Sequence, residues 1–178
     1  YLLPMYLQNG LLLAVALTGI VMLPGGLVNA LVSAFAGRMY DSIGAKRPVM
    51  IGFVIAIVGI VMLLLTTAHS AVAYVIAAHV ILMIGCPLAM SPVQTSALNA
   101  LRGPASSDGS TILNTMQQIV GALATALATS FLELGRHAAA GSQAMRFTSG
   151  VHTGLYFTLA LAIIALIVSF SLPKQNAD

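Results

Sequence analysis

The chain has 178 residues, of which 59% are hydrophobic and 6% are charged, and its mean hydropathy is +1.00. A soluble domain carries about 25% charged residues, so this composition excludes a soluble protein and predicts an all-α integral membrane protein. The net charge of +3 comes with no basic stripe, which argues against a nucleic-acid partner. The single cysteine, Cys86, excludes an internal disulfide and a CxxC redox pair.

The first residues predict the end of a helix. Tyr1–Leu7 is apolar but much shorter than the ~20 residues that a span needs. We therefore expect a truncated helix in a chain that is a fragment, followed by a turn at Gln8-Asn9-Gly10. The first complete span is expected over about residues 11–36, with a kink at Pro24 and Gly25.

A polar segment, Gly37–Arg47, separates this span from the next apolar one and carries both signs of charge. It predicts the short loop of a membrane hairpin, in which glycine permits a tight reversal. Asp41 can accept hydrogen bonds from Arg38 or from an exposed helix N-terminus. Lys46 and Arg47 are typical of a loop held on the cytoplasmic side. The alternative interpretation is a basic cytoplasmic loop without a further role.

Two apolar segments follow the loop. Residues 48–66 contain almost no polar side chain and predict a helix that faces lipid. Residues 71–101 are too few for two spans, so they predict one long bent helix with breaks at Pro87 and Pro92.

The last third of the sequence predicts two more spans, over about residues 109–134 and 153–172. The first is preceded by a Gly- and Ser-rich loop, in which Ser107 or Asp108 is a candidate N-cap. The segment Gly135–His152 is expected to be the longest loop. Residues 1–172 would then form one transmembrane domain, and residues 173–178 a cytoplasmic tail.

Amide side chains recur at helical spacing on the first, third and fourth complete spans, whereas the second and fifth lack them. As a set they favour a water-filled cavity, although hydrogen bonding between helices is the alternative for each one. The candidate cavity-lining residues are Asn29, Gln94, Asn99, Asn114, Gln117 and Gln118.

The loop charges predict an orientation. With Gly37–Arg47 in the cytoplasm, five of the seven Lys and Arg residues lie inside and two, Arg136 and Arg146, lie outside, as the positive-inside rule expects. The C-terminus is then cytoplasmic.

The run G-R-M-Y-D-S-I-G-A-K-R resembles the loop signature of the major facilitator superfamily. With the segments P-M-Y-L-Q-N, L-P-G-G-L and S-P-V-Q-T-S-A-L-N-A-L, it resembles the C-terminal half of fourteen-helix drug:proton antiporters, and the likeness covers essentially the whole chain. The resemblance implies multidrug efflux by alternating access in a bacterial plasma membrane, and a missing N-terminal half as partner. It further implies a proton gradient as energy source, no cofactor, and small amphipathic or cationic substrates. The residues that match the signature, expected to act as a conformational lock, are Gly37, Arg38, Asp41, Gly44, Lys46 and Arg47.

Two other classes of function compete with transport. In a membrane-embedded enzyme, His79 and Ser91 would be base and nucleophile, but about 18 Å of helix separates them. The four histidines show no metal-ligand spacing, so neither catalytic nor metal-binding residues are predicted. His79 on its own is a packing residue or a functional one. The third class is a structural or assembly subunit of a membrane complex.

Overall fold

The computed structural model describes residues 1–99 and 105–171, with side chains from 108 onward in the second part. Five helices in these ranges are long and apolar enough to cross a membrane. The predicted all-α fold, a partial helix followed by five spans, is confirmed. The elements are α1 (Leu2–Met5), the π-helical turn η1 (Tyr6–Gly10), α2 (Val15–Ile43), α3 (Lys46–Leu64), α4 (Val72–Asn99), α5 (Ala105–Ala138) and α6 (Gln143–Ser169).

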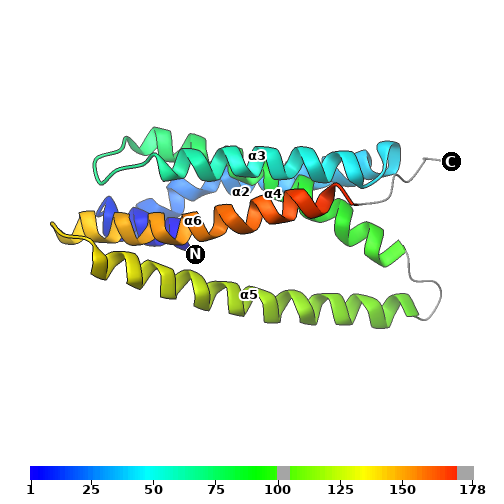
Figure 1. Cartoon of the computed structure of the whole chain (residues 1–178). Helices are drawn as coiled ribbons and strands as arrows, with labels where there is room; N and C mark the ends of the chain where they lie inside the picture. The colour runs from blue at the N-terminus through cyan, green and yellow to red at the C-terminus, as the bar shows by residue number, and fades with distance from the viewer. Residues whose placement is uncertain (100–104, 172–178) are drawn as a thin grey trace.

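The helices form two groups, which Figure 1 shows side by side. In the first group α4 packs between α2 and α3, so the sequential neighbours α2 and α3 touch little. In the second group α5 packs on α6, and α6 joins the two groups by packing on α3. The first elements, α1 and η1, lie against α6. Among the described residues α5 has few contacts with any long helix except α6, so most of its surface is uncovered.

The contact between α3 and α4 is the most extensive in the bundle, and glycine makes it close. A Cβ atom on Gly52 would lie 2.4 Å from the backbone nitrogen of Ala89, and one on Gly85 would lie 2.3 Å from that of Ala56. Small residues at such positions let two helix backbones approach each other within a membrane. One face of α3 thus packs on α4, while its other face leaves apolar residues such as Ile51, Val54 and Val58 exposed.

The beginning of the chain is more helical than its sequence indicates. Gln8-Asn9-Gly10 does not form the predicted turn but belongs to η1, and the chain turns over residues 11–14 instead. The Asn9 side chain donates a hydrogen bond to the Met5 carbonyl (3.1 Å), so it supports the helix rather than a turn. Tyr6 is buried and its hydroxyl donates to the Thr67 carbonyl (2.6 Å), which ties this segment to the turn between α3 and α4.

The predicted loop at Gly37–Arg47 is mostly helix. Helix α2 continues to Ile43 and α3 begins at Lys46, so the turn consists of two residues. Gly44 ends α2 with φ +73°, and its N–H donates to the Tyr40 carbonyl (2.9 Å), as glycine does at many helix C-termini. Gly37 lies inside the helix and makes no reversal.

The prediction of a long loop over Gly135–His152 is also wrong. Helix α5 ends at Ala138 and α6 begins at Gln143, which leaves a turn of four residues. The Ser142 side chain caps α6 by accepting a hydrogen bond from the Met145 N–H (3.4 Å). The polar residues after Gly135 lie on helices that extend beyond the apolar segment.

At its other end α5 begins at Ala105, so neither Ser107 nor Asp108 is its N-cap. Asp108 lies in the first turn, where a carboxylate still complements the helix dipole. Helix α2 continues through Pro24. The single helix predicted over residues 71–101 corresponds to α4, which continues through Pro87 and Pro92 and is described up to Asn99. Residues 100–104, which include the end of that predicted helix and the start of the predicted Gly- and Ser-rich loop, lie outside the described residues. So do residues 172–178, which include the predicted tail.

Candidate functional site

The charged residues of the signature segment lie at one end of the bundle, around the turn between α2 and α3. Lys46 donates to the carbonyl of Phe170 at the end of α6 (2.5 Å), which fixes α3 to α6 there. The Arg38 guanidinium lies 5.9 Å from the centre of the Phe35 ring. Arg38 and Asp41 do not form the expected pair, since no ion pair joins these two described residues. Asp41 and Arg47, on either side of the turn, are both exposed.

The candidate cavity residues lie in three places rather than in one. Asn29 faces α4, where its amide donates to the Met83 sulfur (3.7 Å). Asn99 donates to the Tyr40 hydroxyl (3.3 Å), close to the signature segment, and Gln94 lies half-buried on the same helix. The three from α5 are all exposed: Asn114, Gln117 and Gln118. The amide stripe of α5 is therefore not covered by the other helices that the structure describes.

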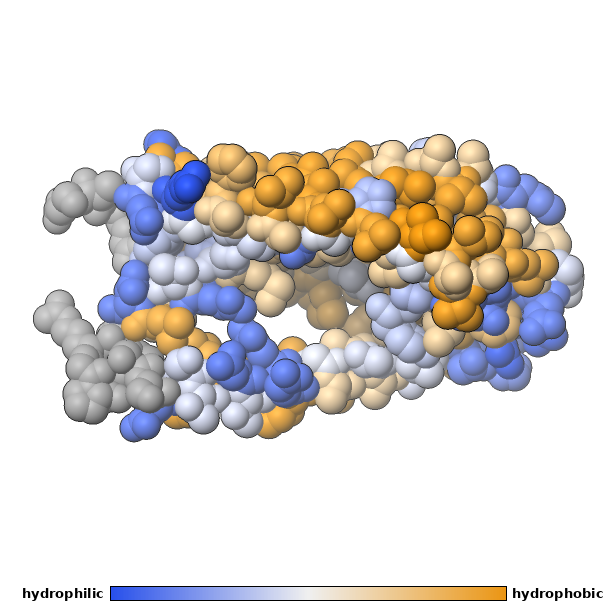
Figure 2. Space-filling model, turned by 180° about the vertical axis from the view of Figure 1, so that it is seen from behind, coloured by the Kyte–Doolittle hydropathy of each residue, from blue (hydrophilic) through white to orange (hydrophobic). Residues whose placement is uncertain are grey.

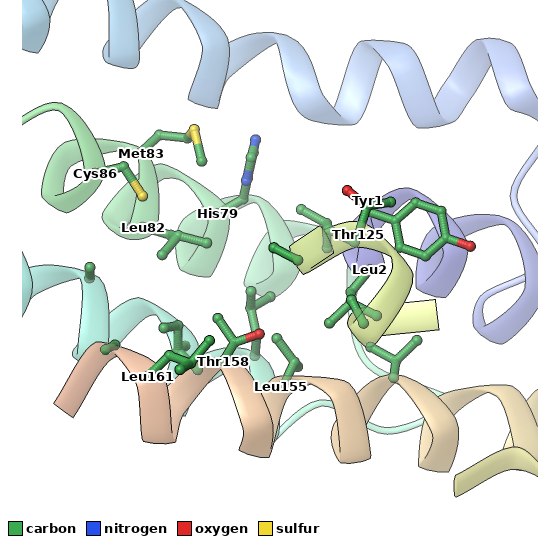
Figure 3. Close-up of a pocket in the computed structure, with 18 of the residues that line it drawn as sticks. Tyr1, Leu2, His79, Leu82, Met83, Cys86, Thr125, Leu155, Thr158 and Leu161 are labelled. Atoms are coloured by element: carbon green, nitrogen blue, oxygen red, sulfur yellow. The ribbon is translucent and has the colours of Figure 1, made fainter. Parts of the chain in front are cut away.

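A large groove of about 790 Å³ lies between α5 and the rest of the bundle. Figure 2 shows it from behind as a hollow beneath a broad apolar surface with polar residues at both ends. In Figure 3, Leu82, Met83 and Cys86 of α4 face Leu155 and Leu161 of α6 across it. Tyr1 and Leu2 lie at its edge.

The groove is apolar and offers little hydrogen bonding. The hydroxyls of Thr125 and Thr158 donate to carbonyls of their own helices, Gly121 (2.8 Å) and Gly154 (2.9 Å). The six predicted amide residues are not among those lining it. Sequence reasoning missed the groove because its walls are leucine, methionine and alanine, which no pattern distinguishes from core or lipid-facing residues.

Among the described residues, His79 is the one side chain with a nitrogen atom at the groove wall, and it is 5% exposed. Its ring packs on Gly25 of α2, and its Nδ1 atom has no hydrogen-bond partner in the described part of the chain. His79 and Ser91 lie on the same helix, so the structure does not bring them together as base and nucleophile. No group of three or more metal-ligating side chains occurs in the part of the chain that the structure describes. The groove is therefore suited to contact with apolar molecules or apolar helix surfaces.

Comparison with known proteins decides the family. The family model of the Major Facilitator Superfamily matches residues 1–125. This chain belongs to the major facilitator superfamily. The resemblance seen in the signature segment is thus confirmed, and the protein is a multi-pass membrane protein of this superfamily.

Curated relatives in this superfamily are similar along nearly the whole chain. The "Lincomycin resistance protein LmrB" of Bacillus subtilis is 39% identical over 188 residues, which cover 99% of this chain and 39% of that protein. The protein of the same name from Listeria monocytogenes is 38% identical over 183 residues, covering 98% and 39%. The "Uncharacterized MFS-type transporter YcnB" of Bacillus subtilis is 27% identical, covering 98% and 37%. The chain thus spans about two fifths of the length of the curated relatives it matches.

Proposed function

We propose that this chain is the C-terminal six-helix half of a drug-efflux transporter that works by alternating access. The single observation that carries the proposal is the 37–39% identity, over 98–99% of the chain, to proteins named for lincomycin resistance. The fourteen-helix drug:proton antiporter type, a proton gradient as energy source, and small amphipathic or cationic substrates belong to the same proposal.

The uncovered surfaces support the presence of a second half. The α5 face that carries Asn114, Gln117 and Gln118 is exposed, and so are Ile112, Ile119 and Leu123 on the same helix. A helix with both amide and apolar side chains uncovered fits neither lipid nor water alone. We propose that the N-terminal half of the transporter covers this side, and that the amides of α5 face the pathway between the halves.

The charge distribution supports an orientation in the plasma membrane. Arg38, Lys46 and Arg47 lie at the end of the bundle where α2 ends and α3 begins, whereas Arg136 and Arg146 lie at the end where α5 meets α6. Under the positive-inside rule the first end is cytoplasmic, and so is the C-terminus.

A chimera tests the proposed function. The segment of the Bacillus subtilis relative that matches this chain would be replaced with the chain, and the product expressed in a host without other lincomycin resistance. We expect resistance and reduced drug accumulation, both abolished by a protonophore. A chimera that reaches the membrane at normal abundance and gives no resistance would contradict the proposal and favour a structural or assembly subunit.

The same chimera tests Asp41 as part of the lock. The carboxylate is exposed at the end of α2, where it can reach a helix N-terminus of the other half, a contact that contributes about 0.3–2 kcal/mol. Asp41→Asn is therefore expected to lower efflux by about 2- to 30-fold while membrane abundance stays unchanged. The control is Asp41→Glu, which keeps a carboxylate at this position and is expected to retain efflux. Equal efflux by Asp41→Asn and the unaltered chimera at equal abundance would contradict a role of Asp41 in the conformational lock.

Single cysteines test the pathway. In a chimera with Cys86→Ala, we expect cysteines at Asn114, Gln117 and Gly121 to react with a polar thiol reagent, because the thiolate that reacts forms only where water enters. Cysteines at Ile57 and Ile164, on the helices without amide stripes, are expected to stay unreactive. Similar labelling rates for both sets would show that the amides of α5 serve packing alone.

A further inference from the structure

The end of the bundle where α5 meets α6 contains a second, much smaller pocket of about 240 Å³. Its lining residues are Arg136 from the last turn of α5, Gly141 from the turn, and Gln143, Arg146 and Phe147 from the first turns of α6. Two arginines from different helices thus share one small polar space, at the opposite end from the signature segment.

Both guanidinium groups are held in place through their Nε atoms. The Arg136 guanidinium lies 4.8 Å from the centre of the Phe147 ring, and its Nε is 3.3 Å from a carboxylate oxygen of Glu133. The Nε of Arg146 donates to the Arg136 carbonyl (3.1 Å). Arginine has five N–H donors, and the terminal amino groups of both residues have no acceptor among the described residues. The two groups together present a fixed set of unused donors.

The electrostatics of this pocket favour an anion. Glu133 offsets only one of the two guanidinium charges. Arg146 stands near the N-terminus of α6, where the helix dipole disfavours a cation, and the first turn of α6 contains no acidic residue. An anion in the pocket would stabilise both the arginine pair and the helix N-terminus.

The position of the pocket indicates which anion. Both α5 and α6 are long enough to cross the membrane, so their turn lies at the level of the lipid headgroups. Leu134 and Met145, next to the pocket residues along the two helices, are 63% and 54% exposed and offer apolar contact to a lipid. We propose that the pocket formed by Arg136, Arg146 and Gln143 binds the phosphate of an anionic phospholipid and thereby anchors the α5–α6 hairpin. This inference goes beyond the proposed function and does not depend on drug transport.

Lipid binding to the purified full chain tests the inference by native mass spectrometry, with phosphatidylglycerol and phosphatidylcholine as probes. We expect phosphatidylglycerol to bind more tightly, and Arg146→Gln to weaken its binding at least about tenfold, since charge-assisted hydrogen bonds are lost. Arg146→Lys keeps the charge without the planar fork, so an intermediate affinity is expected. The matched control is Arg38→Gln, which removes one positive charge at the other end of the bundle and is expected to bind as the unaltered chain does.

A second variant separates binding from folding. Gln143→Glu places an acid in the first turn of α6, where it favours the helix, and in the pocket, where it repels phosphate. We expect unchanged or higher thermal stability together with weaker phosphatidylglycerol binding. Equal losses of phosphatidylglycerol affinity in Arg38→Gln and Arg146→Gln would show that the lipid is attracted by surface charge in general, and would overturn the proposal. Binding of inorganic phosphate as tight as that of the lipid would show that a free anion is the ligand, and would likewise overturn the proposal.

Discussion

Alanine at Gly85 is expected to destabilise the bundle strongly although it adds only one methyl group. A Cβ atom there would lie 2.3 Å from the Ala56 nitrogen and 2.6 Å from the Gly52 carbonyl oxygen. Both are backbone atoms of α3, so the clash is relieved only when one helix moves away from the other. Overpacking of this kind costs about 1–3 kcal/mol or more, and it falls on the most extensive helix contact in the structure.

Thermal unfolding of the chain in lipid bicelles, followed by circular dichroism, measures this effect. The matched control is Gly121→Ala on α5, where an added Cβ atom meets nothing within 4 Å. There we expect a neutral or slightly stabilising change, since alanine favours a helix by about 0.5–1 kcal/mol over glycine. Equal melting temperatures for the two variants would mean that α3 and α4 do not pack as described.

The number and order of the membrane spans follow from the sequence, because a bilayer admits only apolar segments long enough to cross it as helices. The helix ends do not follow in the same way, since polar residues predict loops there. Arg38 and Asp41, and likewise His137 and Arg146, lie on helices that extend past the apolar segment. The signals that end or begin these helices are single residues, Gly44 and Ser142, which composition alone does not weigh.

The candidate site was less predictable than the fold. Helical spacing placed Asn29 and Gln117 on predicted helices, but it does not say which face of a helix meets which neighbour. Asn29 meets a methionine sulfur, whereas Gln117 is exposed in the described part of the chain. The arginine pocket depends on a four-residue turn that brings Arg136 and Arg146 together. A long loop over Gly135–His152, as composition predicts, would not bring the two side chains together.

Gly25 and His79 form another close contact of the bundle, between α2 and α4. A Cβ atom on Gly25 would lie 2.3 Å from Cδ2 and 2.4 Å from Nε2 of the His79 ring. Gly25→Ala is therefore expected to push the two helices apart and lower the free energy of unfolding by about 1–3 kcal/mol. His79→Ala leaves a cavity and is expected to be destabilising as well, by a similar amount.

The double variant is expected to lose less free energy of unfolding than the two single variants lose together, because the new methyl group occupies space that the ring has left. Residues in contact show coupling of about 0.5–3 kcal/mol, so the four unfolding free energies form a double-mutant cycle with a clear coupling energy. Strictly additive effects would contradict the contact between Gly25 and His79.

The same two substitutions test whether His79 has a role in transport besides packing. If His79 only packs, the chimera that carries both Gly25→Ala and His79→Ala regains membrane abundance and lincomycin resistance together. If the imidazole takes part in transport, the double variant regains abundance but not resistance. We expect the first result, because the ring is buried against Gly25 of α2 and is hydrogen-bonded to the backbone of Met22 on the same helix, as a packing residue would be. A stable double variant without resistance would make His79 a functional residue.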